Sequence, residues 1–473
     1  MKPDEASKVN AAMISRKEIE QKAGEFGIHV ANVQRDYVFG WLLIALYNAT
    51  KLRDVLILKG GNCFRKAYFP NTRFSNDLDF STEAAIDPAA VVEEFNSGCR
   101  FVQDNAGVAF DLDRSQIREQ QRLDDKRRVF DVRVYFKDFY GNADHITIRL
   151  SIDITEFDRI YLPIQARNII HPYSDQASCA GQIRCLKLEE MIANKLKCLL
   201  QRQHVPDVYD LVYSVFVNRD IAVDRGEVLA TFLRKTIYER SPSVARQLLL
   251  ELPLVALKAA WTRYIVAPLQ GWLDFDEAIE RFAEIINELF AAYQVGGRAA
   301  FAFFPSALRA PIMQAGAEQR LMRLTYKGVT REIEPYSLVY KQRKDGHREE
   351  YFYAYDRTGG RTSGPGIKSF LNHEIERLEM LDAKFDPRYA NELSKAGETQ
   401  GRGYFNRPFG SRNTLARGRW STLRHGWRYS VECSYCSRKF TRMRRDTALK
   451  PHKDSYGNQC FGRRGIIVSQ QLV

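Results

Sequence analysis

The sequence has no long hydrophobic run: its longest apolar stretch, WLLIAL at residues 41–46, is far too short to span a bilayer. Its first forty residues also lack the apolar core and the small-residue cleavage site of a secretory signal. We therefore expect a cytoplasmic protein without a membrane partner. In that compartment eight cysteines do not indicate a disulfide framework, and the five scattered ones are expected to be core residues or surface thiols.

Acidic residues are scarce in the C-terminal region, where residues 402–464 hold only Glu432, Asp446 and Asp454 among many arginines. The whole chain carries a formal net charge of +13. Such a basic segment is typical of a tail that binds a polyanion, with RNA favoured and DNA not excluded. The alternative is a solvated surface that only keeps the protein soluble.

The length of 473 residues exceeds what one hydrophobic core usually supports, so the sequence predicts an α+β multidomain protein. Residues 55–58 and 77–80 read as short strands. Residues 146–155 alternate strictly between apolar and polar side chains, and residues 131–136 alternate similarly, which predicts a hairpin. Helical periodicity follows, with Leu188, Ile192, Leu196 and Leu199 on one stripe.

Three tyrosine-rich strands are predicted beyond the Gly296-Gly297 pair, at residues 323–326, 332–340 and 350–356. They indicate a small barrel-like β domain. The predicted domains are a mixed α/β domain at 1–220, a helical extension at 221–295, the β domain at 296–396, a basic linker at 397–424 and a cysteine-bearing module at 425–473.

Asp77 and Asp79 are two residues apart on a predicted strand, so both side chains project from the same face. Asp153 lies on the polar face of another strand. Carboxylates brought together in this way repel one another, and Mg²⁺, which takes oxygen ligands, would relieve that repulsion. Two such ions can serve phosphoryl transfer.

Gly60 and Gly61 follow a predicted strand and precede a helix expected to start near Phe64. Backbone amides at such a turn form an anion site, because no side chain blocks the approach. The order of strand, glycine pair, helix, Asp-x-Asp strand and later Asp strand is far more specific than any one of these signals.

The pattern Lys59-Gly60-Gly61 followed by Arg73-x-Ser75-x-Asp77-Leu78-Asp79-Phe80 resembles the signature of nucleotidyltransferases of the AbiEii/AbiGii abortive-infection toxin type. The segment Arg35-Asp36-Tyr37-Val38 is similar to that family's first helix. Glu189-Glu190, Lys195-Leu196 and Asp207-x-Tyr209-Asp210-Leu211 are similar to its later helical motif. The resemblance extends to about residue 290.

This resemblance implies a polymerase-β-like nucleotidyltransferase fold, a nucleotide bound at the glycine turn, and a function in toxin–antitoxin or phage-defence systems. Asp77 and Asp79 would ligate Mg²⁺, and Asp153 would complete that site or act as the base. The implied nucleotide-binding residues are Lys59, Gly60, Gly61, Asn62, Arg73, Ser75, Lys195 and Asp207. For Lys195 and Asp207 the alternative is ordinary charge on a helix surface.

Two positions depart from the family pattern. Asn62-Cys63 replaces the hydroxyl or small residue common after the glycines, and Pro206 stands where an arginine is frequent. Asn62 retains the ability to hydrogen-bond a phosphate, but the departure bears on nucleotide choice and on activity.

The segments Leu324-Thr325-Tyr326, Glu334-Pro335-Tyr336 and Ala354-Tyr355-Asp356, with Arg361, resemble a WYL domain. That resemblance implies an SH3-like β-barrel that senses a ligand or nucleic acid. Tyr351, Tyr353 and Tyr355 would share one face and could stack on bases; the alternative is that these tyrosines form the core of the barrel.

Cys433-x-x-Cys436, followed by His452 and Cys460, has the spacing of four ligands around one metal ion. Thiolate and imidazole in a tetrahedral set select Zn²⁺, and four protein ligands indicate a structural site. In a module of about 50 residues, a metal replaces the missing core.

Together these features predict a metal-dependent nucleotidyltransferase that transfers a nucleoside monophosphate from an NTP to an RNA acceptor, tRNA among the candidates, with a cognate antitoxin as partner. Two alternatives stay open. One is a catalytically silent regulator that binds nucleotide and nucleic acid, and the other is transfer to a hydroxyl of a protein.

Overall fold

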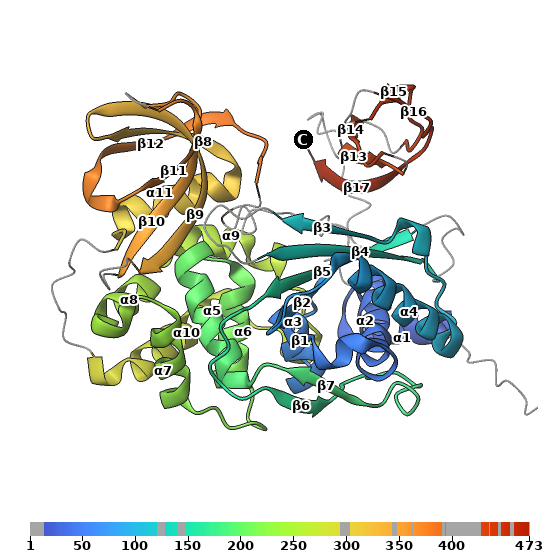
Figure 1. Cartoon of the computed structure of the whole chain (residues 1–473). Coiled ribbons are helices and arrows are strands. Elements are labelled where there is room, and N and C mark those ends of the chain that lie inside the picture. The colour runs from blue at the N-terminus through green and yellow to red at the C-terminus, as the bar shows by residue number, and fades with distance from the viewer. Residues whose placement is uncertain are drawn as a thin grey trace, which may run out of the picture.

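The computed structural model describes residues 14–120, 128–139, 147–293, 303–342, 348–360, 363–389, 393, 427–434, 436–442, 446–454 and 458–472. The predicted linker at 397–424, Arg361 and the arginines within 401–426 and 443–445 lie outside these ranges. Figure 1 shows a large α/β part, a second sheet and a small C-terminal module.

The α/β part is built on a seven-stranded mixed sheet with the strand order β3-β4-β5-β2-β1-β7-β6. The pairs β2/β5 and β1/β7 are parallel and the other neighbours are antiparallel. The predicted hairpin is confirmed, since β4 pairs with β5. The strands are β1 (Ile57–Lys59), β2 (Asp77–Thr82), β3 (Gln116–Gln120), β4 (Val129–Lys137), β5 (Thr147–Glu156), β6 (Gln165–Asn168) and β7 (Gln182–Cys185).

Helices cover both sides of this sheet, with α1, α2 and α4 on one side and α5 and α6 on the other (Figure 1). Their ends follow local chemistry: α4 starts after Asp87, whose side chain accepts a hydrogen bond from the Ala89 amide, and ends at the left-handed Gly107. The helices of this part are α1 (Arg16–Phe26), α2 (Val30–Ala49), α3 (Gly60–Cys63), α4 (Pro88–Ala106), α5 (Leu188–Arg202), α6 (Val205–Val212), α7 (Arg225–Lys235), α8 (Pro242–Leu250), α9 (Leu254–Tyr264) and α10 (Phe275–Leu289).

One hydrophobic core joins the sheet to all of these helices, from Ile14 to Phe303. The strict alternation in β5 explains how the sheet contributes: Ile152 and Ile154 are fully buried in this core, while Asp153 between them is half-buried. The predicted helical stripe from Leu188 to Leu199 is confirmed, because its leucines are buried along α5. The predicted boundary at residue 220 remains a prediction.

The second sheet is antiparallel, with the strand order β11-β10-β9-β8-β12, and α11 (Ser306–Glu318) packs on it. Within the described residues no pairing joins β11 to β12, so this sheet is open and the predicted barrel is not identified. Its strands are β8 (Arg320–Tyr326), β9 (Val329–Gln342), β10 (Arg348–Asp356), β11 (Gly366–Phe370) and β12 (Ile375–Lys384).

The tyrosines of β10 do not form the centre of this second sheet's core. Phe352 and Ala354 are fully buried there, and a bulge after Tyr353 interrupts the alternation. Tyr351 and Tyr355 are half-buried, and the Arg388 guanidinium lies 4.6 Å from the Tyr355 ring. Tyr353 itself is buried, with 8% of its surface exposed, and Tyr355 packs against a smaller core cluster, so the alternative that the tyrosines build the core stays open.

A buried polar junction fixes the second sheet to the helices of the first part. Arg309 of α11 pairs with Glu350 of β10 and donates to the Leu200 carbonyl of α5 at 2.6 Å. It also donates to the Tyr238 hydroxyl at 3.3 Å. Both charged side chains are at most 2% exposed, so a desolvated ion pair within the second part holds the guanidinium that bonds to the first part.

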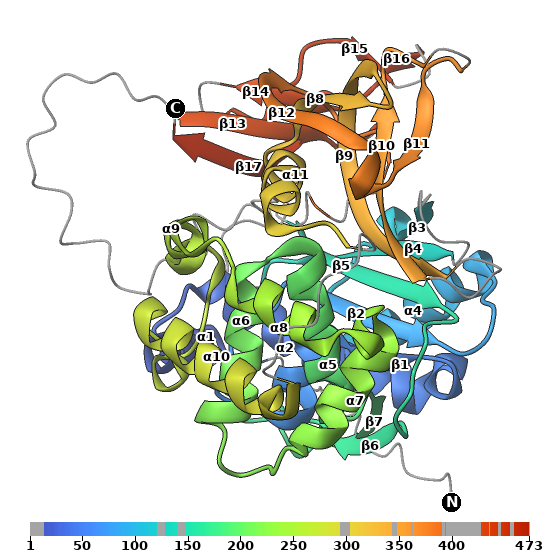
Figure 2. The ribbon, with the colours of Figure 1, turned by 90° about the vertical axis from the view of Figure 1, so that its left-hand side faces the viewer.

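The C-terminal module contains a three-stranded sheet and a short hairpin. Its strands are β13 (Trp427–Cys433), β14 (Lys439–Arg442), β15 (His452–Lys453), β16 (Gln459–Cys460) and β17 (Gly465–Leu472). In Figures 1 and 2 this module stands over the β3 and β4 edge of the large sheet. Among the described helices, none combines the length and the apolar character needed to cross a membrane.

Candidate functional site

Asp79 and Asp153 are directly paired in register on the neighbouring parallel strands β2 and β5. Directly paired residues point to the same face of a sheet, and Asp77 lies two residues before Asp79 on that face. All three carboxylates are half-buried. The structure thus brings together the three acidic residues that the sequence singles out.

The row of paired positions continues on both sides of these carboxylates. Lys59 of β1 is paired with Asp79, and Asp131 of β4 is paired with Asp153. Lys59 Nζ lies 2.8 Å from Asp158 Oδ2. Arg133 lies 2.7 Å from the Asp131 carboxylate, which offsets part of the negative charge beside Asp153.

The glycine pair lies inside the first helical turn, because α3 begins at Gly60 and continues as a π-helical turn over Phe64–Tyr68. The predicted helix start near Phe64 is therefore wrong, since the helix begins at Gly60. The strand predicted at 55–58 is observed at 57–59, as β1. Gly60 has φ +74°, and a Cβ there would lie 2.0 Å from Asp79 Oδ2. Only glycine permits this approach of the turn to the carboxylate.

Gly61 is equally confined, since a Cβ there would lie 2.6 Å from Ser75 Oγ and 2.8 Å from the Arg73 guanidinium. The Ser75 hydroxyl donates to Asp77 Oδ1 at 2.7 Å. The Gly61 backbone therefore lies against Ser75 and Arg73, and Ser75 holds the first of the three carboxylates.

The residues that depart from the family pattern point into the protein. Asn62 is 1% exposed and its amide donates to the Asp77 carbonyl at 2.5 Å, while Cys63 is fully buried. Asn62 thus holds the backbone of the Asp-x-Asp strand. The Asn62-Cys63 departure consequently falls in the scaffold behind the glycine turn.

A buried ion network links Arg73 to α5 and α6. Arg73 makes two hydrogen bonds of 2.7 Å to the Asp210 carboxylate. Lys195 Nζ lies 2.8 Å from both Asp207 and Asp210, and Arg202 Nε lies 2.9 Å from Asp207. Lys195 is 7% exposed and Asp207 is fully buried, so the alternative of helix-surface charge is wrong.

This network carries one more positive than negative charge, because three cations surround two carboxylates. Burial alone would lower the pKa of Lys195, but Asp207 and Asp210 outweigh it and raise that pKa. Burial alone would raise the pKa of Asp207, but Arg202 and Lys195 hold it well below its usual range. Lys195 and Asp207 are therefore charged at neutral pH, and Arg73 of the same network lies beside the glycine turn.

The donor set on the sheet fits the predicted Mg²⁺. Mg²⁺ takes carboxylate oxygens and leaves positions open for substrate phosphates. Asp77, Asp79 and Asp153 supply such oxygens from one face, and the close approach of Gly60 leaves backbone rather than side chain next to Asp79.

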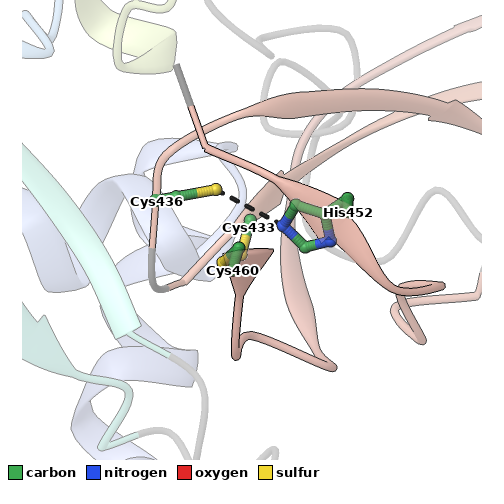
Figure 3. A group of neighbouring side chains, drawn as sticks. All are labelled: Cys433, Cys436, His452 and Cys460. Carbon is green, nitrogen blue, oxygen red and sulfur yellow. Dashed lines mark hydrogen bonds between the residues drawn. The ribbon is translucent and has the colours of Figure 1, made fainter. Parts of the chain in front are cut away.

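The second candidate metal site is the cluster of Cys433, Cys436, His452 and Cys460, whose potential ligand atoms all lie within 4.8 Å of one another. Figure 3 shows the four side chains converging. A tetrahedral Zn²⁺ with bonds of about 2.3 Å sets its ligand atoms about 3.8 Å apart. The Sγ atoms of Cys433 and Cys460 are 3.8 Å apart, so the residues fit this ion.

The imidazole of His452 is oriented by its own loop. Nδ1 lies 2.9 Å from the Lys450 carbonyl, and Nε2 lies 3.3 Å from Cys436 Sγ. A proton on Nδ1 that is donated to this carbonyl leaves Nε2 for a metal. The cluster is compatible with a structural zinc site.

Several residues of the site escape sequence reasoning. Asp131 lies in the other strand of the predicted hairpin, where polar and apolar residues alternate as they do around Asp153. This alternation could have predicted that Asp131 pairs with Asp153. Asp210 falls inside the helical motif, but its contact with Arg73 spans 137 positions in the sequence. Asp158 follows β5 without any pattern that predicts its contact with Lys59.

Residues 41–321 match the profile of the family described as "Nucleotidyl transferase AbiEii toxin, Type IV TA system". No curated protein matches the chain. The chain is similar to the structure of MenT4, a nucleotidyltransferase toxin from Mycobacterium tuberculosis H37Rv, with 16% identity and a TM-score of 0.35 over 60% of this chain and 91% of that one. It is also similar to proteasome accessory factor B/C of Arthrobacter aurescens, with 12% identity and a TM-score of 0.17 over 82% of this chain and 77% of that one.

Proposed function

The chain belongs to the AbiEii family of nucleotidyl transferase toxins of type IV toxin–antitoxin systems, and on that premise we propose that it transfers a nucleoside monophosphate from an NTP to an RNA acceptor. The acceptor class includes tRNA. The observation that supports this most directly is the pairing of Asp79 with Asp153, with Asp77 on the same face and the glycine turn against Asp79.

The nucleotide is proposed to bind between the glycine turn and the cationic network. The backbone of Gly60 and Gly61 receives the phosphates, and Lys59 and Ser75 flank them. Arg73 and Lys195 supply positive charge, while Asp207 holds Lys195 in place rather than touching the nucleotide. Asn62 acts through the Asp77 backbone, which it supports.

In the reaction the acceptor hydroxyl oxygen attacks the α-phosphorus of the NTP. The new bond joins that oxygen to phosphorus, the bond from the α-phosphorus to the bridging oxygen breaks, and pyrophosphate leaves. Asp77 and Asp79 would hold Mg²⁺, which when bound neutralises charge that develops on the phosphate oxygens. Asp153 takes the proton from the attacking hydroxyl, or it completes the ligand set and that proton passes to solvent water.

The remaining parts are proposed to serve nucleic-acid recognition. We propose that residues 296–396 form the WYL-like β domain and that residues 425–473 form the zinc-binding module. An SH3-like arrangement of the second sheet would present the half-buried Tyr351 and Tyr355 to a ligand. A cognate antitoxin is expected from the type IV family context.

The test is incubation of the purified full chain with Mg²⁺, total bacterial RNA and each α-labelled NTP in turn. The double variant Asp77→Ala/Asp79→Ala and the variant Asp104→Ala, which changes an exposed carboxylate on α4, are assayed beside it. We expect label in RNA for the unchanged protein and for Asp104→Ala, and none for the double variant. Equal labelling by the double variant would remove the site assignment.

A silent regulator is the second candidate, and the Asn62-Cys63 departure is the observation that favours it. Against this candidate, both residues are buried behind the turn, so the departure leaves the carboxylates and the cationic network intact. Nucleotide binding without label transfer to any RNA, under all four NTPs, would select the regulator. Label on the protein itself would instead indicate a protein acceptor.

A further inference from the structure

The row of paired positions across the large sheet ends in an arginine. Arg118 of β3 is paired with Asp131, which is paired with Asp153, which is paired with Asp79. All four side chains therefore belong to the same face of the sheet. Neighbouring strands are about 4.8 Å apart, so Arg118 lies about 10 Å from Asp153 along the sheet.

The zinc-binding module lies beside this arginine. A cavity of about 480 Å³ is lined by Arg118 of the sheet and by Cys436, Ser437, Arg438 and Asp454 of the module. Figures 1 and 2 both place the module above the β3 and β4 edge. The module and Arg118 of this face thus line one polar cavity.

The side chains that line the cavity suit a phosphodiester backbone. Both arginines are exposed, and each is oriented by one hydrogen bond: Arg118 Nε donates to Gln116 Oε1 at 3.1 Å, and Arg438 donates to the Lys453 carbonyl at 2.9 Å. A guanidinium held in this way keeps further donors for phosphate oxygens. Asp454 accepts the Asn458 amide at 2.9 Å and so closes the loop between β15 and β16.

We propose that this cavity binds the sugar–phosphate backbone of the acceptor RNA a few nucleotides from its reacting end. The zinc-binding module is then the element that positions the acceptor over the carboxylates of the sheet. This inference rests on the proposed function for the identity of the acceptor. The binding itself depends only on Arg118, Arg438 and the position of the module beside β3.

The test measures binding of a fluorescent single-stranded oligoribonucleotide of mixed sequence to the full zinc-loaded chain at several salt concentrations. The variants are Arg118→Gln and Arg438→Gln, with Arg100→Gln on α4 as an exposed control of equal charge change. We expect each cavity variant to weaken binding about tenfold and to lower the salt slope by about one, while Arg100→Gln changes little. Zinc content verifies that Arg438→Gln keeps the module folded.

Two outcomes would overturn the inference: no binding of the oligoribonucleotide by the unchanged protein, or cavity variants that bind it as Arg100→Gln does. Failure of the proposed function has a different signature. In that case no NTP label is transferred, yet the oligoribonucleotide still binds in a manner that depends on Arg118 and Arg438.

Discussion

Asp79 and Asp153 lie side by side on the parallel strands β2 and β5, and the Gly60 turn, which follows β1, lies against Asp79. Two carboxylates on neighbouring strands raise each other's cost of ionisation unless a cation lies between them. A metal ion bound by both carboxylates would therefore have its position set by the geometry of the sheet.

Replacing Asp153 by Asn distinguishes its two proposed roles. A ligand role predicts that the Mg²⁺ concentration for half-maximal transfer rises about tenfold or more, because one carboxylate oxygen ligand is lost. A base role predicts an unchanged Mg²⁺ requirement together with loss of the acidic limb of the pH–rate profile. Transfer measured against Mg²⁺ and against pH separates the two, and full activity in both series would exclude Asp153 from the site.

Replacing Gly60 by Ala should reduce transfer far more than it reduces stability. The left-handed φ of +74° costs about 1–2 kcal/mol for alanine, whereas the new Cβ would displace the Asp79 carboxylate. The control is Gly24→Ala in α1, where nothing lies within 4 Å of the added Cβ and helix propensity favours alanine. Transfer rates and urea unfolding of both variants check this; unchanged transfer in Gly60→Ala would contradict the geometry.

Replacing Lys195 by Met should destabilise the protein by about 3 kcal/mol or more, because Asp207 loses one of its two cations and Asp210 keeps only Arg73. The half-buried Lys197, two residues later on α5, is the matched control and should cost less when it is changed to Met. Urea unfolding at neutral pH measures both free energies. Similar values for the two variants would mean that the network contributes little.

Stability should fall in acid through Asp207. Its pKa is depressed in the folded state and is about 3.9 in the unfolded chain, so the unfolded chain binds more protons in acid. The free energy of unfolding therefore has its full contribution from Asp207 above about pH 5 and loses it as the pH falls below that value. Urea unfolding between pH 3 and pH 7 should show this slope, and Asp207→Asn should flatten it.

Zinc removal should unfold the C-terminal module and leave the large sheet intact. Replacing Cys436 by Ser removes one of the four ligands, whereas Cys198→Ser on α5 changes a thiol outside the cluster. We expect one bound zinc in Cys198→Ser and less than one in Cys436→Ser, with faster proteolysis beyond residue 427 in the latter. Nucleotide binding should be the same in both, and equal zinc content would contradict the ligand assignment.

Sequence reasoning locates those features of the site that depend on local pattern. Strict alternation over residues 146–155 places Asp153 on the polar face of its strand, and the spacing of Asp77 and Asp79 places both on one face. The cluster of three cysteines and His452, which is compatible with zinc, is likewise readable from the spacing of its residues.

Features set by long-range packing are not readable in this way. The register that pairs Asp79 with Asp153 depends on which strands the core brings together, and a slip by one residue would turn the carboxylate away. The burial of Lys195 depends on Arg73 and Asp210 arriving from distant segments. The left-handed turn at Gly60 depends on the position of Asp79 rather than on any neighbour in sequence.

The Arg309–Glu350 junction has a mechanical consequence. Arg309 and Glu350 both move with the second sheet, so swinging this sheet away from α5 keeps the ion pair. It breaks the hydrogen bonds from the buried Arg309 guanidinium to the Leu200 carbonyl and the Tyr238 hydroxyl, which costs about 1.5–3 kcal/mol for each hydrogen bond to a charged group. Thermal fluctuations rarely supply that free energy, so we expect the second sheet to keep its position relative to α5. A displacement of the second sheet would consequently also move the C-terminal end of α5, near Leu200, and α5 is the helix that carries Lys195.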